Sequence, residues 1–173
     1  MIANTTAIQK KLNSIRLLAF DVDGILTDNH IWMTEVGQWR RAFSVRDGYG
    51  IQMLRERGYQ MAIITGSNSD DVRERARVLK MNYFYEGTLD KIPAYKDVKL
   101  KSGFTDSEIL YMGDDVFDLP LIEQSGFGVT VPEASEHIRE KSDFVSTQPG
   151  GKGAVREICD LVLLHGFYRG NVK

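Results

Sequence analysis

Two aspartates stand two residues apart at the end of a short apolar run. The run Leu17–Phe20 is followed at once by Asp21, Val22, Asp23 and Gly24. Hydrophobic burial does not explain this placement, because two like charges crowded at a strand end repel each other unless a cation is close. We therefore predict that Asp21 and Asp23 belong to a reaction site that requires a positively charged partner.

A second group of acids follows the apolar run 109–112. Gly113 leads into Asp114 and Asp115, and Asp118 comes three positions later. A helix N-terminus favours an acid, which accounts for Asp118 but poorly for the two consecutive acids before it. Combined with the first pair across a sheet, these carboxylates predict a hard, oxygen-preferring cation. Mg²⁺ fits, because it binds through one or two carboxylates together with substrate phosphate and water.

Two further positions suit a phosphate group. Thr65 and Gly66 end the apolar run 61–65, where a hydroxyl can donate and a glycine lets the backbone N–H approach closely. A Thr-Gly pair by itself is more often only a turn. Lys91 stands at the start of a predicted helix, where a cation gains nothing from the helix dipole. A bound phosphate would explain this lysine, and a solvated side chain is the plain alternative.

The elements that must position these residues alternate between short apolar runs and amphipathic stretches. Strands are predicted at 17–20, 61–65, 83–85, 109–112, 127–131 and 144–145, and helices at 50–57, 70–80, 92–101, 119–124, 134–141 and 154–164. Short strands without polar alternation, separated by helices, predict an α/β fold with a parallel sheet covered on both faces. Ligands bind beyond the carboxyl ends of such strands, where the acids stand. The length predicts one domain, residues 1–173.

Composition narrows the function classes. Hydrophobic residues make up 42% and charged residues 27%, and the net charge is −2, so the basic excess of a nucleic-acid-binding surface is absent. No apolar run approaches the ~20 residues that span a bilayer, and the polar N-terminus has no signal-peptide core. The only cysteine, Cys159, cannot form an intrachain disulfide. We predict a cytoplasmic protein without membrane or nucleic-acid partners.

One stretch breaks the alternation and predicts a protruding β-hairpin. Residues 31–34 and 38–43 read as two short strands around a turn that contains Gly37. Both tryptophans of the chain, Trp32 and Trp39, lie on this projection. An isolated hairpin cannot bury them itself, so they pack either on the parent domain or on another subunit. The second interpretation is favoured, because large exposed apolar patches mark interfaces.

Taken in order, the motifs resemble those of a known superfamily. The sequences Asp21-x-Asp23-Gly24-x-Leu26-Thr27, Thr65-Gly66, Lys91 and Gly113-Asp114-Asp115-x-x-Asp118 are similar to the four motifs of the haloacid dehalogenase superfamily of phosphohydrolases. The resemblance implies a Rossmann-like core. It implies that Asp21 is a nucleophile forming an aspartyl-phosphate, and that Asp23 is the general acid and then the general base.

The same resemblance implies how the phosphoryl group and the metal are held. Thr65, Gly66 and Lys91 would bind the phosphoryl group. Asp21, the backbone carbonyl of Asp23 and Asp114 would bind Mg²⁺, with Asp118 in support. Lys91, backbone amides and the metal would offset the repulsion between an anionic phosphate and an anionic nucleophile.

The spacing between the motifs leaves no room for a cap domain. Residues 44–51 and 150–157 resemble the capless subfamily of 3-deoxy-D-manno-octulosonate 8-phosphate (KDO 8-phosphate) phosphatases. That resemblance implies a homotetramer in which neighbouring subunits complete each other's sites. It also implies that Arg46, Asp47 and Arg75 face the substrate, whereas solvated charge is the interpretation of the two arginines without it.

Two positions depart from the subfamily pattern and keep the exact sugar open. Ser67 replaces a frequent arginine after Thr-Gly, and Gln52 replaces another frequent arginine. Arginine suits substrate carboxylates because of its bidentate fork. The alternative substrate is another keto-sugar acid, such as a nonulosonate 9-phosphate, although related phosphatases for those sugars tend to have an acid at position 67. Whether the tail 166–173 enters a neighbouring site is left open.

Two other classes of protein share part of this pattern. A phosphoaspartate receiver domain also combines a parallel sheet, magnesium, aspartates, a threonine and a lysine. It would need its acceptor aspartate on a strand separate from an early acidic pair, whereas the run 61–65 ends in threonine. A catalytically silent homologue is the other alternative, and the complete set of acids argues against it.

Overall fold

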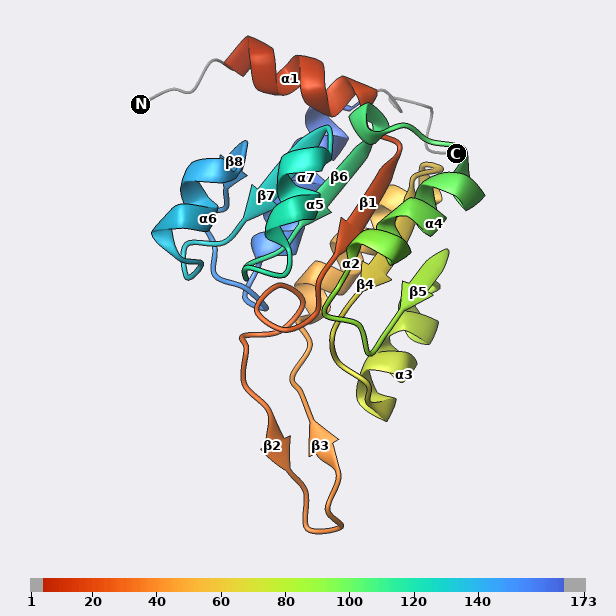
Figure 1. Ribbon diagram of the computed structural model, residues 1–173, viewed down its shortest axis with the longest axis vertical. Coiled ribbons are helices and arrows are strands. Elements are labelled where there is room, and N and C mark those ends of the chain that lie inside the picture. The colour runs from red at the N-terminus through yellow and green to blue at the C-terminus, as the bar shows by residue number, and fades with distance from the viewer. Residues whose placement is uncertain (1–4, 167–173) are drawn as a thin grey trace.

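A six-stranded parallel sheet forms the centre of the molecule (Figure 1). The computed structural model describes residues 5–166. The strand order is β5-β4-β1-β6-β7-β8, so the first strand lies in the middle, between β4 and β6. The strands are β1 (Leu17–Phe20), β4 (Gln60–Ile64), β5 (Tyr83–Tyr85), β6 (Ile109–Met112), β7 (Phe127–Thr130) and β8 (Phe144–Val145). This is the predicted parallel α/β sheet.

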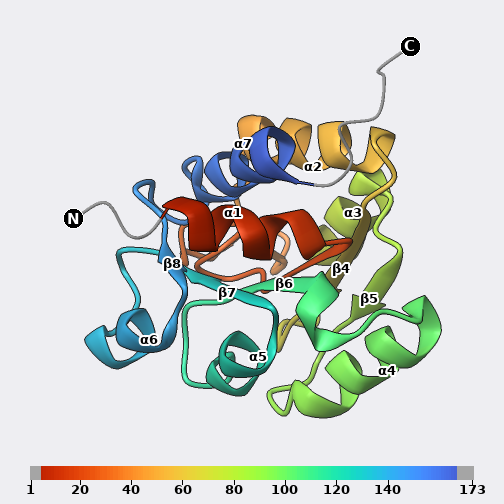
Figure 2. The same ribbon diagram turned by 90° about the horizontal axis from the view of Figure 1, so that it is seen from above.

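Helices cover both faces of the sheet (Figure 2). One layer holds α1 (Thr5–Ser14), α2 (Val45–Glu56), α3 (Asp70–Leu79) and α7 (Ala154–His165). The other layer holds α4 (Ile92–Ser102), α5 (Leu119–Gln124) and α6 (Glu136–Lys141), and a 3₁₀ turn at Asp106–Glu108 leads into β6. Within residues 5–166 no cap domain interrupts this arrangement.

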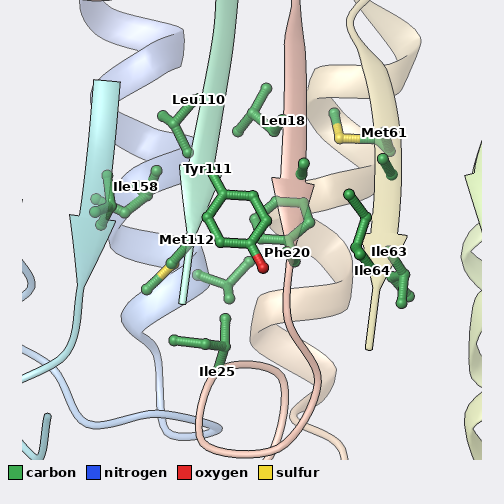
Figure 3. Close-up of a cluster of buried hydrophobic side chains, with 14 of the residues drawn as sticks. Leu18, Phe20, Ile25, Met61, Ile63, Ile64, Leu110, Tyr111, Met112 and Ile158 are labelled. Carbon is green, nitrogen blue, oxygen red and sulfur yellow. The ribbon is translucent and has the colours of Figure 1, made fainter. Parts of the chain in front are cut away.

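The core is built on the central strands (Figure 3). Every residue of β1 and β6 is buried, as expected for strands covered on both faces. Phe20 and Tyr111 are among the largest buried side chains, and Ile158 of α7 joins the same cluster. The strands that carry the acids are therefore held rigidly by close packing.

Helix α2 begins earlier than predicted. It starts at Val45 instead of Gly50, and the side chain of Ser44 caps it by accepting a hydrogen bond from the backbone N–H of Asp47. Glycines inside the first turns obscured the helix in the sequence. Gly50 is required by packing, because a Cβ there would lie 3.0 Å from Cβ of Cys159 on α7. Close contact between α2 and α7 overrides the low helix propensity of glycine.

The predicted hairpin is present and protrudes from the body (Figure 1). Its strands, β2 (Trp32–Met33) and β3 (Trp39–Arg40), are shorter than predicted and pair only with each other. Trp32 and Trp39 are 49% and 48% exposed, so packing on the parent domain, the first of the two predicted alternatives, does not occur. The apolar side chains of the hairpin remain uncovered within one chain.

Two further predictions concern membrane-spanning segments and the C-terminal tail. In that part of the chain, every helix is too short or too polar to cross a lipid bilayer. The question about the C-terminal tail concerns residues 167–173, which lie outside the described residues.

Candidate active site

The carboxyl ends of three adjacent strands bring the predicted motifs together. Asp21 directly follows β1, Thr65 directly follows β4, and Asp114 follows β6 by two residues. The backbone N–H of Asp21 donates to the carbonyl of Met112 at 2.9 Å, which extends the β1–β6 ladder to Asp21. Sequence positions far apart thus meet at one edge of the sheet, as predicted for parallel strands.

A cavity of about 290 Å³ opens at this edge. All the residues predicted for catalysis, phosphoryl binding and metal binding by the four motifs line it, together with other residues of the same loops: Asp21, Asp23, Asn29, Thr65, Gly66, Ser67, Leu89, Lys91, Asp114, Asp115, Phe117 and Asp118. The sequence did not single out Asn29, Leu89 or Phe117. Leu89 and Phe117 are partly exposed apolar side chains, and their type alone gave no signal of a site.

Lys91 is the positive group of the cavity. Its side chain is 3% exposed, and Nζ lies 3.0 Å from Oδ1 of Asp21 and 2.6 Å from Oδ1 of Asp118. Burial alone lowers the pKa of Lys91, but the charges of these two aspartates outweigh burial and raise it above its ordinary value. Lys91 is therefore held as a cation, and the solvated alternative is wrong.

Asp118 is a fully buried carboxylate whose two oxygens are both saturated with donors. Oδ1 accepts hydrogen bonds from Lys91 Nζ and from the Tyr111 hydroxyl, each at 2.6 Å. Oδ2 accepts the backbone N–H groups of Asp114 and Asp115, each at 3.1 Å. Asp118 thus fixes both the lysine and the loop after β6, which suits a supporting role.

Asp114, unlike Asp118, has a carboxylate oxygen to which no described residue donates. Its Oδ1 is buried and has no hydrogen-bond partner among the described residues. Burial, followed by the charges of Asp21 and Asp118, raises the pKa of Asp114 to about 8. Burial and the charge of Asp118 likewise raise the pKa of Asp21 to about 7, against the lowering effect of Lys91. The site contains more negative charge than one lysine offsets.

These carboxylates fit a divalent cation. Ligand oxygens of Asp21, Asp114 and Asp118 lie within 4.8 Å of one another. The orphaned oxygen of Asp114 and the raised pKa values are what an oxygen-preferring cation would relieve. Because both oxygens of Asp118 are already occupied, Asp21 and Asp114 are the side chains available to the ion.

The side chain of Asp23 is held by an arginine that the sequence analysis missed. Arg41, which follows β3, donates from Nε to Oδ1 at 2.6 Å and from Nη2 to Oδ2 at 3.1 Å. Asp23 is about one-third exposed, so its carboxylate still faces the cavity. Nothing in the spacing of Arg41 marked it, because it lies in a segment that was predicted only as a hairpin strand.

The loop before α7 packs against the loop after β1, which carries Asp21 and Asp23. The backbone N–H of Gly151 donates to the carbonyl of Ile25 at 2.9 Å. A Cβ on Gly150 would lie 1.8 Å from the carbonyl oxygen of Gly24, so only glycine permits this approach. Loop 150–151 therefore braces the turn that carries Asp21 and Asp23.

Three predicted substrate residues lie outside the cavity within one chain. Asp47 is 1% exposed and accepts the backbone N–H groups of Gly153 and Arg156, at 3.3 and 2.8 Å, which caps the start of α7. Arg75 donates to the Ser44 carbonyl at 2.8 Å and stacks over Phe43. Arg46 lines a separate hollow next to α7.

Comparison with known proteins assigns the family. Residues 81–158 match the family model of haloacid dehalogenase-like hydrolases. The chain is 39% identical over 160 residues to the 3-deoxy-D-manno-octulosonate 8-phosphate phosphatase KdsC of Salmonella typhi. The matched residues make up 92% of this chain and 85% of that relative. The chain belongs to the KDO 8-phosphate phosphatase family. Membership in this family of haloacid dehalogenase-like hydrolases removes the receiver-domain alternative.

Solved structures of KDO 8-phosphate phosphatases have the same fold. The phosphatase of Moraxella catarrhalis, crystallised with a magnesium ion, a phosphate ion and a KDO molecule, superimposes with a TM-score of 0.89 at 42% identity. That match covers 92% of this chain and 91% of the other. The cobalt-bound enzyme of Haemophilus influenzae gives a TM-score of 0.86 at 36% identity, covering 90% and 91%.

Proposed function

We propose that this protein hydrolyses KDO 8-phosphate to KDO and phosphate, with Mg²⁺ as cofactor. The observation that carries the proposal is the similarity to KDO 8-phosphate phosphatases over about nine-tenths of this chain. One of those phosphatases was crystallised with magnesium, phosphate and KDO. The buried arrangement of Asp21, Lys91 and Asp118 at the sheet edge supports a phosphoryl-transfer reaction at this site.

In the first half-reaction, a carboxylate oxygen of Asp21 forms a bond to phosphorus. The bond between phosphorus and the sugar oxygen breaks, and its electron pair stays on that oxygen. Asp23 gives its proton to the same oxygen, so KDO leaves as an alcohol. Asp21 then carries the phosphoryl group as an aspartyl-phosphate.

In the second half-reaction, water attacks the phosphorus of the aspartyl-phosphate. Asp23, now ionised, takes the proton from that water and is restored. The bond between phosphorus and the Asp21 oxygen breaks, which releases inorganic phosphate. Lys91, the Thr65 hydroxyl and the backbone at Gly66 hold the phosphoryl oxygens through both steps.

Asp21, the backbone carbonyl of Asp23 and Asp114 are the proposed Mg²⁺ ligands, with Asp118 in support. A bound magnesium ion supplies positive charge that stabilises the charge developing on the phosphoryl oxygens. The contacts that the family pattern implies for Arg46, Asp47 and Arg75 stay predictions: within one chain Asp47 and Arg75 bind other groups, and Arg46 lines a separate hollow.

The test is magnesium-dependent phosphate release from a panel of substrates. We expect KDO 8-phosphate to be turned over best, and nonulosonate 9-phosphates poorly. Asp21→Asn, which keeps the size of the side chain but removes the nucleophile, should reduce turnover by roughly 10³-fold or more. Undiminished turnover in Asp21→Asn would refute the nucleophile, whereas a preference for a nine-carbon sugar would refute only the substrate.

We also propose that the protein is a homotetramer in which neighbouring subunits close the cavity. The support is the projecting hairpin with Trp32 and Trp39 about half exposed, together with the absence of a cap within residues 5–166. Light scattering at micromolar concentration tests this, and a monomer would contradict it. A cytoplasmic location and a single domain over residues 1–173 stay predictions from the sequence.

A further inference from the structure

Arg41 is a buried cation beside the cavity to which neither the motifs nor the proposed mechanism gives a task. Its side chain is 7% exposed. It follows β3 of the hairpin directly, and its guanidinium reaches back to the loop after β1 and the loop before α3. An arginine buried this deeply requires partners for its charge.

All five N–H donors of the Arg41 guanidinium are used. Nε and one Nη2 proton bind the two oxygens of Asp23, as a parallel fork. The other Nη2 proton goes to Ser67 Oγ at 2.8 Å. Nη1 donates to Ser69 Oγ at 3.0 Å and to Asp71 Oδ1 at 3.3 Å. A guanidinium has five donors and no acceptor, so none is left for a substrate.

One partner of Arg41, Asp71, is fixed in the first turn of helix α3. Asp71 is 9% exposed, and its Oδ1 also accepts the Ser69 hydroxyl and the backbone N–H of Val72. Burial lowers the pKa of Arg41, but the hydrogen bonds and charges of Asp23 and Asp71 outweigh burial and raise it. Arg41 is thus permanently charged and cannot rotate away without breaking several charge-assisted hydrogen bonds.

We infer that Arg41 is a positioning residue that aims the Asp23 carboxyl at the leaving oxygen of the substrate. This inference rests on the proposed function, because it assigns Arg41 to the proton transfer of the same reaction. A bidentate guanidinium fixes both the position and the plane of a carboxylate, which a single hydrogen bond does not do. Correct placement of a general acid is what proton transfer to a poor leaving group requires.

This arrangement gives the serine at position 67 a structural role. Ser67 Oγ accepts from Arg41, and Ser67 N donates to Thr65 Oγ1 at 3.0 Å. An arginine at position 67 would lose this contact and bring a second positive charge next to Arg41 unless its side chain turned away. The departure from the subfamily pattern is therefore matched by a guanidinium that arrives from the hairpin.

The experiment compares two esters that differ in leaving-group basicity. Phenyl phosphate has a basic leaving oxygen that needs a proton, whereas 4-nitrophenyl phosphate has a leaving oxygen that departs as an anion. In Arg41→Met, we expect kcat/KM to fall roughly 100-fold for phenyl phosphate and less than about threefold for 4-nitrophenyl phosphate. The ratio kcat/KM covers the steps up to phosphorylation of Asp21, so the later role of Asp23 as base does not enter.

Two further variants sharpen the comparison. Arg41→Lys keeps the charge but not the fork, so we expect an intermediate loss of roughly tenfold for phenyl phosphate. Arg40→Met is the matched control, because Arg40 is the adjacent arginine and its bonds stay within the hairpin, to Gln38 and the Trp39 carbonyl. Its kcat/KM should be unchanged for both esters. Circular dichroism and light scattering establish that each variant keeps its fold and assembly.

Three outcomes would overturn the inference. Equal losses for both esters would mean that Arg41 only supports the structure. A loss for neither ester would mean that Asp23 is placed without it. A rise in KM with unchanged kcat would make Arg41 a phosphate contact. Inactivity of the unchanged protein towards KDO 8-phosphate would refute the proposed substrate alone, because the aryl ester comparison does not depend on it.

Discussion

The carboxylate cavity and the hairpin are built in opposite ways. In the cavity, Lys91 and Asp118 are almost fully buried, and their charged atoms are matched by partners at 2.6 to 3.1 Å. In the hairpin, two strands pair only with each other and leave both tryptophans about half exposed. The Lys91–Asp118 pair finds its partners within a single chain, whereas the hairpin presents large apolar side chains without a covering surface.

We expect the cavity to carry out the chemistry and the hairpin to contribute to the selection of substrate. Phosphoryl transfer needs groups held within fractions of an ångström, and close-packed strands provide that rigidity. Exclusion of water and recognition of a sugar need a surface over the cavity, and in the proposed homotetramer the hairpin would be where a second copy docks. Changes in the two regions should therefore affect different measurements.

After replacement of the proposed nucleophile itself, the largest effect should come from Asp118→Asn. Replacing one carboxylate oxygen by an NH₂ group turns it towards either Lys91 and Tyr111 or the two backbone N–H groups, and every one of these is a donor. We expect kcat for KDO 8-phosphate to fall by roughly 10²- to 10³-fold. Asp97→Asn on the exposed face of α4 is the control. Activity within tenfold of the unchanged protein would show that the cavity does not need this carboxylate.

A smaller and more selective effect is expected from the double variant Trp32→Ser, Trp39→Ser. Large aromatic side chains dominate interface energies, so we expect the assembly to dissociate in light scattering. The kcat/KM for KDO 8-phosphate should drop roughly tenfold, whereas that for 4-nitrophenyl phosphate should stay the same. Val36→Ser at the hairpin turn serves as control. Equal losses on both substrates would erase the distinction between the two regions.

The charge in the cavity should also be visible in stability. In the folded protein the pKa values of Asp21 and Asp114 are about 7 and about 8, above their ordinary 3.8. The folded state then holds protons that the unfolded chain has lost, so metal-free protein loses stability as pH rises from about 4 to 8. Mg²⁺ should offset that loss, and its upward shift of Tm should grow over this range to roughly 5 °C.

The measurement is differential scanning fluorimetry with Mg²⁺ or with chelator, at constant ionic strength. Asp114→Asn serves as the matched variant, since it removes one of the two strained carboxylates. The Mg²⁺ shift should become smaller in that variant and depend less on pH. A Tm shift that is the same at pH 5 and pH 8 would contradict the account of surplus negative charge.

The smallest effect should come from Tyr111→Phe. The hydroxyl of Tyr111 gives Asp118 one of its four hydrogen bonds, and Lys91 still occupies the same oxygen after its removal. We expect kcat to fall about threefold and the free energy of unfolding to fall by about 1.5 kcal/mol. Tyr83→Phe, whose hydroxyl binds Gln60 away from the cavity, is the control. A loss as large as that of Asp118→Asn would mean that the four bonds to Asp118 act as one unit.

The sheet and the acidic loops could be predicted from the sequence. Strands β1, β5, β6 and β8 have the predicted bounds, because apolar runs on a doubly covered sheet end where polar loop residues begin. The cavity residues were predictable for the same reason, since Asp21, Thr65 and Asp114 stand at strand ends that a parallel sheet brings together. At these positions the local sequence pattern and the strand order of the sheet both predict the same site.

The rest depends on packing that no local pattern records. The start of α2 was missed because its glycines are set by the distance to α7. Arg41 was missed because its partners come from two other loops, and no signal in the sequence indicated that Asp47 caps α7. Charged side chains look alike in a sequence whether they meet a ligand, a helix end or another side chain.

The brace between loop 150–151 and the first acidic loop has a consequence for the order in which the protein matures. During synthesis, the turn with Asp21 and Asp23 leaves the ribosome long before Gly150 and Gly151 do. Until those two glycines emerge, a nascent chain can hold every proposed catalytic residue and still lack the backbone contact to Ile25. Activity should therefore appear only after residues 150–151 have emerged and folded onto that turn.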